Sequence, residues 1–415
     1  MANSLIVNSQ NATASFPDNA TRYAPISGRI IAGQTTEANV QSPIRDGGTF
    51  SNLFVYAPTN TASVTSVITL RKSAADTAVT VSYTADQTGI KEDNSNSVLF
   101  ANTDEAAYSV VIPNEVGSNT LDITIIGIQF APTTSTDCIS YFVEQSGVTL
   151  NAASSLYYFT PTGLVANTAF AEAQAKYRAR ASFTISDFYA YASANNRTTN
   201  TVFTTRKSGA GGGQTFTYTS GQTGAKEDSS GSDSLVAGDD FCYEIATGTG
   251  TETMTLNIIS CSCISTANFF PLLVGATAGV TIGTNTTSYA PSSGLLAFNA
   301  TEANSQIYPR FDFTASELGV YVSANTSTLL ACTVTLRDNV GDSALTVSYA
   351  ATQTGLKNDS VNTATITSGA DEIDYEITNS DLVGGPTITW IGILGSTAAA
   401  PSTAKISKMM LMGVG

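Results

Sequence analysis

Apolar and polar residues alternate along much of the chain, which is the pattern of strands with one buried face. Residues 64–71 and 78–83 alternate in this way, and the polar residues 72–77 between them are typical of a turn. These two segments are predicted to form a β-hairpin. Residues 108–112 and 121–128 show the same alternation, and we predict that they form a second hairpin.

One short segment occurs three times, as Ile-Thr-Leu-Arg-Lys, Phe-Thr-Thr-Arg-Lys and Val-Thr-Leu-Arg-Asp. Its arginines, Arg71, Arg206 and Arg337, are 135 and 131 residues apart. Further sets of residues keep this register or come close to it. They are Gly28, Gly163 and Gly294; Glu37, Glu172 and Glu302; Gln-Thr-Gly at 87–89, 222–224 and 353–355; and Tyr108, Tyr243 and Tyr375. This many markers in one register predict three tandem copies of one unit.

A short apolar segment is predicted to close each unit, and a fourth copy of it near the N-terminus is expected to supply an opening strand. The closing segments are residues 141–143, 272–274 and 409–412, and the fourth copy is residues 5–7. The chain ends directly after the last segment, so we expect its C-terminus to be complete. The predicted domains span residues 1–144, 145–275 and 276–415.

Each unit contains roughly eight short strands, spaced as they are in β-sandwiches. We therefore predict an all-β fold of three tandem β-sandwich domains with jelly-roll-like topology. Residues 169–178 have a helix-like composition, but their counterparts 35–45 and 299–310 are rich in Asn, Thr, Ser and Pro. We predict an irregular or extended segment there, with a single helical turn as the alternative.

Composition excludes several classes of protein. The chain has no histidine, which excludes Ser-His-Asp triads, Cys-His pairs and histidine zinc sites. Its net charge is −15 and its few basic residues are scattered, so we predict no nucleic-acid partner. No apolar run is long enough to span a membrane, so we predict no membrane insertion. Residues 1–17 lack the features of a secretion signal, which indicates assembly in the cytoplasm or export by another path.

Five cysteines, an odd number, argue against a disulfide framework. Cys261 and Cys263 would point to the same face of one strand, and a bridge from Cys242 to one of them is an alternative if both stretches form one hairpin. We expect all five to be buried, reduced thiols, because free cysteine behaves as a small apolar residue.

The repeated arginines are candidate contact residues. Arg71, Arg206 and Arg337 each end a strand, where they would bind a ligand carboxylate or phosphate, or a neighbouring domain. Alternatively, each pairs with an acid or a backbone carbonyl of its own unit. We favour the second interpretation, because a residue repeated in every tandem unit usually serves the fold of the unit.

The repeated aspartates after the Gln-Thr-Gly turn form a second candidate set. Asp93, Asp228 and Asp359 lie in polar loops, and Glu92 and Glu227 stand beside two of them. Oxygen-rich loops can hold Ca²⁺, but one carboxylate per loop is too few alone. We favour an Asx-type turn, in which the carboxylate accepts nearby backbone N–H groups. We therefore predict no metal site, no cofactor and no catalytic residue.

Alternating aromatic residues at 188–191 would expose tyrosines on one face, as sugar-binding proteins do. We favour instead a role in the core or in a contact between domains. The paired acids at 239–240 and 371–372 fit polar strand ends, and nothing in the sequence places two of them across a cleft as a glycosidase requires.

The combined markers resemble a repeat of phage virion proteins and related bacterial surface proteins. The matching residues are Thr35 to Ala38, Ala194 and Asn195, Ala324 to Thr326, and Gly238 with Asp239, together with the Arg and Gln-Thr-Gly segments. Asp338 and Thr103 depart from this pattern. The resemblance covers nearly the whole chain three times and implies a β-sandwich used in tail fibres, capsid decorations or appendages.

The sequence therefore predicts a non-enzymatic structural protein of a phage virion, most simply a capsid decoration or head-fibre component. Its partners would be other virion proteins, either the major capsid protein or tail proteins, with self-association and host glycans as further candidates. The alternative is a receptor- or glycan-binding tail fibre, or a surface adhesin or appendage subunit, outside the cell or on its surface.

Overall fold

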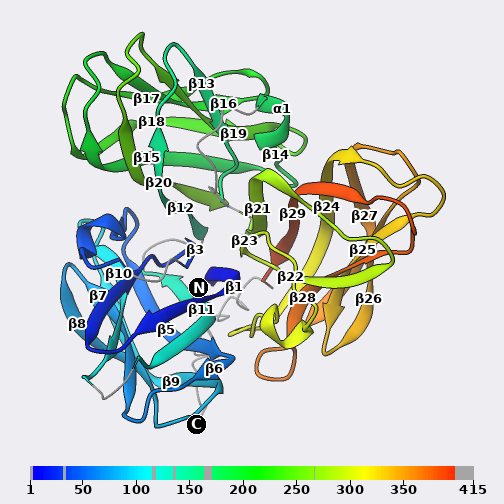
Figure 1. Cartoon of the computed structure of the whole chain (residues 1–415), viewed down its shortest axis with the longest axis horizontal. Coiled ribbons are helices and arrows are strands. Elements are labelled where there is room, and N and C mark those ends of the chain that lie inside the picture. The colour runs from blue at the N-terminus through cyan, green and yellow to red at the C-terminus, as the bar shows by residue number, and fades with distance from the viewer. Residues whose placement is uncertain are drawn as a thin grey trace, which may run out of the picture.

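A computed structural model describes residues 3–30, 34–114, 118–133, 137–162, 171–265 and 267–397. Most of these residues lie in strands, and the strands form sheets that pair into three sandwiches. Figure 1 shows the sandwiches, in blue to cyan, green, and yellow to red, around a common centre. The predicted all-β fold of tandem sandwich domains is confirmed. The markers Gly163 and residues 409–412 lie outside the described residues.

Domain 1 comprises β1 to β11. Its strands are β1 (Ser4–Pro17), β2 (Ala20–Ala24), β3 (Gly28–Arg29), β4 (Ser42–Pro43), β5 (Gly48–Ala57), β6 (Thr59–Asn60), β7 (Ser66–Lys72), β8 (Ala75–Tyr83), β9 (Gly89–Phe100), β10 (Glu105–Ile112) and β11 (Thr120–Pro132). One sheet has the order β1-β11-β5-β9 and the other the order β2-β10-β7-β8. The two-residue strands β3, β4 and β6 pair with β1, β10 and β11. This interleaving of early and late strands is the jelly-roll arrangement.

Domain 2 repeats the arrangement with the orders β12-β20-β15-β18 and β13-β19-β16-β17. Its strands are β12 (Cys138–Leu150), β13 (Leu156–Phe159), β14 (Tyr177–Arg178), β15 (Phe183–Asn195), β16 (Thr201–Lys207), β17 (Ala210–Tyr218), β18 (Gly224–Leu235), β19 (Asp240–Thr247) and β20 (Met254–Ser265).

Domain 3 has the orders β21-β29-β24-β27 and β22-β28-β25-β26. Its strands are β21 (Phe269–Thr281), β22 (Thr286–Pro291), β23 (Gly294–Leu295), β24 (Phe313–Asn325), β25 (Cys332–Asp338), β26 (Gly341–Tyr349), β27 (Gly355–Ile366), β28 (Ile373–Asn379) and β29 (Pro386–Ser396). The three domains therefore share one topology, and the sequence register applies to their structures as well.

The first predicted hairpin is confirmed, because β7 pairs with β8 around a turn at Ser73 and Ala74. The second is wrong. Strands β10 and β11 lie in opposite sheets, and β11 pairs instead with β1 and β5. Alternation identifies a strand with a buried face, but it does not identify the partner of that strand. The same error underlies the proposed Cys242 bridge, because β19 and β20 also lie in opposite sheets. All five cysteines are buried thiols.

The predicted boundaries at 144/145 and 275/276 fall inside strands β12 and β21. β12 pairs with β20 and β21 with β29, so the apolar segments at 141–143 and 272–274 open their domains and do not close the preceding ones. Residues 5–7 belong to β1, which opens domain 1 in the same way. A strand at a junction has the same apolar pattern whether it belongs to the preceding or to the following domain. The sequence pattern therefore does not decide to which domain the strand belongs.

The segment expected to be irregular contains one short helical turn in each domain. These turns are η1 (Glu37–Asn39), α1 (Glu172–Ala175) and η2 (Glu302–Asn304). Each turn begins with the repeated glutamate and is too short for helix propensity to decide. No helix of the described residues has the length and apolarity needed to cross a membrane.

A repeated tyrosine fixes the Gln-Thr-Gly turn to the core of each sandwich. The Tyr83 hydroxyl donates to the carbonyl oxygens of Val55 and Gly89, at 2.7 and 2.9 Å. Tyr218 and Tyr349 make the equivalent pairs of bonds. Gly89 has a φ of 86°, which only glycine adopts at low cost. The turn that the sequence singled out is therefore a structural fixture of the fold.

Candidate functional site: the seams between the domains

The repeated arginines bind an acid of their own domain. Arg71 contacts both carboxylate oxygens of Glu37, at 3.0 and 2.8 Å, and both side chains are largely buried. Arg206 contacts both carboxylate oxygens of Glu172 in the same way, and Arg337 Nε donates to Glu302 Oε1 at 3.0 Å. The Glu37 carboxylate raises the pKa of Arg71 further above its ordinary value. Each pair fastens the short helical turn to the central strand β7, β16 or β25.

The repeated aspartates accept backbone N–H groups. Asp93 accepts those of Ser95, Asn96 and Thr80 at 2.9–3.1 Å. Burial opposes the charge on Asp93, but these bonds outweigh it and lower its pKa to about 2. Asp228 and Asp359 make the same turn. Within the described residues no group of three or more His, Cys, Asp or Glu is arranged to hold a metal ion.

Domain 3 departs from the others at Asp374, which lies opposite Arg337 in the sheet. The side chain is fully buried, and neither carboxylate oxygen has a hydrogen-bond partner among the described residues. Burial raises the pKa of Asp374 to about 8, and nearby Glu302 and Glu376 contribute to the shift. The equivalent positions opposite Arg71 and Arg206 hold Ala107 and Cys242.

The domains contact one another through the outer face of the first sheet of each. Strand β20 illustrates why, since almost every residue along it is buried. Phe54 and Ile125 of domain 1 join the apolar core of domain 3, and Tyr141 and Tyr189 of domain 2 join that of domain 1. Leu394 of domain 3 joins the core of domain 2. Apolar packing therefore crosses all three seams and closes a ring.

At the centre of the ring, strand β1 of domain 1 and the segment after β13 of domain 2 both contact the segment after β22 of domain 3. The Ser9 hydroxyl donates to the Ser293 carbonyl at 2.6 Å, and the Thr162 hydroxyl donates to the Gly294 carbonyl at 3.1 Å. Gly294 has a φ of 98°, and a Cβ there would lie 2.2 Å from Ser9 Oγ and 2.7 Å from the Gly28 carbonyl. Glycine is required at this position by its conformation and by the close approach of domain 1.

At two of the three seams, an arginine of one domain forms an ion pair with a glutamate of the next domain, and we call this pair the clasp. Arg310 of domain 3 lies over the Phe54 ring of domain 1, 5.7 Å from its centroid, and forms an ion pair with Glu92. The Arg310 side chain is only 7% exposed, so this pair is shielded from solvent on one side. Burial opposes the charge on Glu92, but Arg310 outweighs it and lowers the Glu92 pKa. Arg45 of domain 1 pairs with Glu227 of domain 2 in the equivalent way.

The third seam, between domains 2 and 3, has no glutamate at the equivalent position. Arg180 occupies the position of Arg45 and Arg310, and it faces Gly319 of domain 3. Asn358, the cross-strand neighbour of Gly319, stands where the other seams have Glu92 and Glu227. The Nε and Nη2 atoms of Arg180 are buried and have no hydrogen-bond partner among the described residues. Burial lowers the pKa of Arg180 from its ordinary value.

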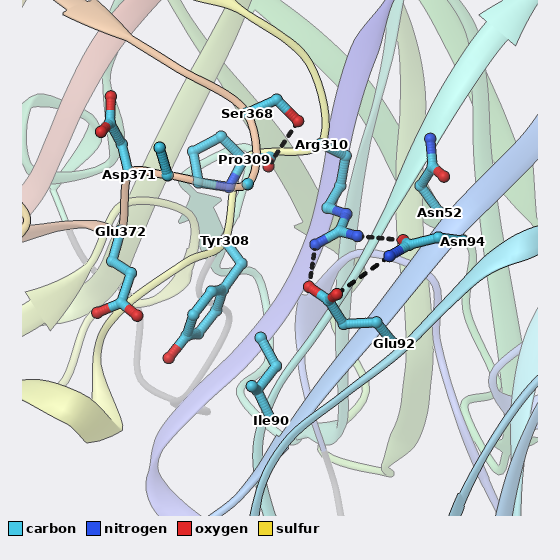
Figure 2. A pocket seen from close by; sticks show the side chains of 12 residues that line it. Asn52, Ile90, Glu92, Asn94, Tyr308, Pro309, Arg310, Ser368, Asp371 and Glu372 are labelled. Atoms are coloured by element: carbon cyan, nitrogen blue, oxygen red, sulfur yellow. Dashed lines mark hydrogen bonds and ion pairs between the residues drawn. The ribbon is translucent and has the colours of Figure 1, made fainter.

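A cleft of about 390 Å³ opens at the seam between domains 3 and 1 (Figure 2). Arg310, Glu92 and Asn94 form a hydrogen-bonded group on one side, and Asp371 and Glu372 stand on the other. The single arginine in this lining is already paired, so the remaining carboxylates make the cleft acidic.

Sequence reasoning did not find the clasp arginines, although a signal was present. Arg45, Arg180 and Arg310 each follow the repeated glutamate by eight residues. In the sequence, Glu92 and Glu227 stand beside the turn aspartates, and nothing there assigns them another partner. Alignment of the three units shows that the arginine recurs in all three and the glutamate in two, but only the ring shows that Arg45 and Arg310 pair with the glutamate of another domain.

We predict that Asn358→Glu stabilises the third seam by about 1 kcal/mol, the order expected of a partly exposed ion pair. The new carboxylate would face the guanidinium of Arg180, as Glu92 faces Arg310. Chemical denaturation of the wild type, N358E, R180Q and the double variant forms a cycle that isolates the pair. An equal gain in the R180Q background would show that the clasp is not the cause.

We also predict that Asp374→Ala stabilises the protein at neutral pH. The folded pKa is about 8, whereas an unfolded aspartate titrates near 4. Wild-type stability should therefore fall by about 1.4 kcal/mol per pH unit between pH 4 and 8. The variant should lack this slope in urea unfolding at pH 5 and pH 8, and Ala107→Asp should introduce a similar slope in domain 1. Parallel pH profiles for wild type and D374A would contradict the prediction.

No protein-family model and no curated protein matches the chain. Among solved structures, it aligns with one described as the triple jelly roll fold and turret assembly in an archaeal virus. The identity is 11%, the TM-score is 0.18, and the alignment covers 94% of this chain and 90% of that one. A Paenibacillus xanthan lyase aligns at 13% identity with a TM-score of 0.17, over 68% of this chain and 30% of the lyase. The chain thus spans less than a third of the lyase. Similarities this weak carry no argument about function.

Proposed function

We propose that the chain is a non-enzymatic structural protein of a virus particle, acting as a capsid decoration or head-fibre component. The observation that carries this proposal is the closed ring of three jelly rolls. Each domain uses one surface to contact the next, and the third domain returns to the first, so the seams leave no free copy of this interface. A heterologous contact that closes in this way yields a discrete unit and not a filament.

Such a unit is a single-chain counterpart of a symmetric trimer. It suits a local threefold position on a particle, where three similar faces meet three similar neighbours. The low share of charged residues, 12%, and the net charge of −15 suit a soluble exterior component. The proposed partners are the major capsid protein or tail proteins, and the proposed location is the virion, assembled in the host cytoplasm.

Domain 3 carries an apolar tip that the proposal assigns to contact with a particle protein. The tip comprises Leu329, Leu330, Leu382 and Val383, which are 81%, 48%, 73% and 58% exposed. Asp381 holds it in shape, because its carboxylate accepts the backbone N–H groups of residues 328, 329, 330 and 383 at 2.6–2.9 Å. Exposed apolar residues on a fixed scaffold are typical of protein-binding surfaces.

Immunogold electron microscopy of particles purified from the source culture tests the location. With an antibody to this chain, we expect regular labelling over particle heads. Labelling confined to tails would replace decoration with a role in adsorption. Label on cell surfaces or free filaments beside bare particles would overturn the virion proposal and favour an adhesin or appendage subunit.

Co-sedimentation with particles that lack the chain tests the tip. The double variant Leu329→Ser and Leu382→Ser is expected to lose at least about tenfold in binding, because truncating central apolar contacts costs more than 1 kcal/mol. Val361→Ser, also on an exposed aliphatic position of domain 3, is the matched control and should bind like the wild type. Equal binding of all three proteins would exclude the tip as the contact.

A further inference from the structure

A second cleft, of about 200 Å³, lies at the seam between domains 2 and 3. Its lining residues are Ala173, Lys176, Arg178 and Asp240 of domain 2, and Tyr321, Leu356 and Trp390 of domain 3. In Figure 1 this seam lies where α1 and β14 approach the sheet containing β24 and β29. The cleft therefore corresponds by register to the acidic cleft between domains 3 and 1, but its chemistry differs.

The floor of the cleft is apolar and aromatic. Trp390 is 1% exposed and packs edge to face against the Tyr177 ring, with centroids 5.7 Å apart. Tyr321 and Leu356 pack against this pair and remain half-buried. The indole Nε1 of Trp390 is buried and has no hydrogen-bond partner among the described residues. A buried donor without an acceptor destabilises the folded state, and native proteins rarely leave one unpaired.

The mouth of the cleft is polar and offers both donors and acceptors. Arg178 and Asp240 form a two-bond ion pair, at 2.7 and 3.1 Å. Their side chains are 39% and 20% exposed, so both keep unused hydrogen-bonding capacity toward the cleft. Lys176 adds a third charged group at the rim.

These features are confined to one seam. The strand position of Trp390, opposite Tyr321, is held by Ile125 and Ile258 in the other domains. The position of Arg178 holds Tyr308 at the seam between domains 3 and 1. Because aliphatic residues close the equivalent positions elsewhere, the packing of the ring alone does not require an indole here.

We propose that the cleft between domains 2 and 3 binds a neutral sugar ring. A pyranose has an apolar C–H face, which suits Leu356 and Tyr321, and hydroxyl groups that both donate and accept. Arg178 offers donors and Asp240 offers acceptors for those hydroxyls, and Trp390 contributes an aromatic ring to the lining of the cleft. This inference adds a carbohydrate site to the structural role and does not depend on it.

The experiment uses Trp390 as its reporter, since it is the only tryptophan of the chain. An array of immobilised neutral oligosaccharides, probed with the full chain, selects the sugars to be tested. Each selected sugar is then titrated in solution while the indole emission is recorded. We expect a saturable change in emission. Arg178→Gln should weaken binding roughly tenfold, because a hydrogen bond to a charged group contributes on that order.

Leu356→Ala is the matched variant for the apolar floor, because domain 2 carries Ala225 at that position. It should weaken binding while the circular dichroism spectrum stays unchanged. Ile90→Ala makes the equivalent change at the seam between domains 3 and 1 and should leave binding unaltered. An array without signal, or titrations that are identical for the wild type and both cleft variants, would overturn the proposal. A response to leucine amide in place of sugars would do the same and would assign the cleft to peptides.

Discussion

The outer face of each first sheet is apolar and must be covered, and the rest of the architecture depends on this constraint. One face of β11, β20 and β29 packs into its own sandwich, while the other face also carries apolar residues. A sheet that is apolar on both faces is stable only when both are shielded from water. A single domain therefore leaves the outer face of its first sheet exposed to water. The three domains cover these faces for one another by closing a ring.

Ring closure explains where the repeated residues diverge. Residues that serve the fold of one unit, such as the Arg71–Glu37 pair and the Asp93 turn, recur in all three domains. Residues at the seams differ, because each seam is a separate interface within one chain and is free to change alone. The clasp is complete at two seams, whereas Gly319 and Asn358 replace its aromatic and acidic partners at the third. A homotrimer with three identical seams has no such freedom.

The same freedom allows each seam to hold different chemistry. The cleft between domains 3 and 1 is lined by carboxylates, whereas that between domains 2 and 3 is lined by Trp390 and an ion pair. The apolar tip of domain 3 lies on two loops that Asp381 holds together. The proposed roles in particle binding and sugar binding thus use parts of the chain that depart from the repeat, on a scaffold built from parts that keep it.

The sequence by itself determined the strand content, the three units and the local roles of the repeated residues. The strand content follows from alternation and the three units follow from repetition, while the turn of Asp93 follows from contacts with the N–H groups two and three residues later. Tertiary structure alone decided the partners of β10 and β11, the direction in which the junction strands β12 and β21 join, and the pairing of Arg310 with Glu92. Each of these is a contact between segments far apart in the chain, and hydrophobic patterning shows that a face is buried without specifying the surface that covers it.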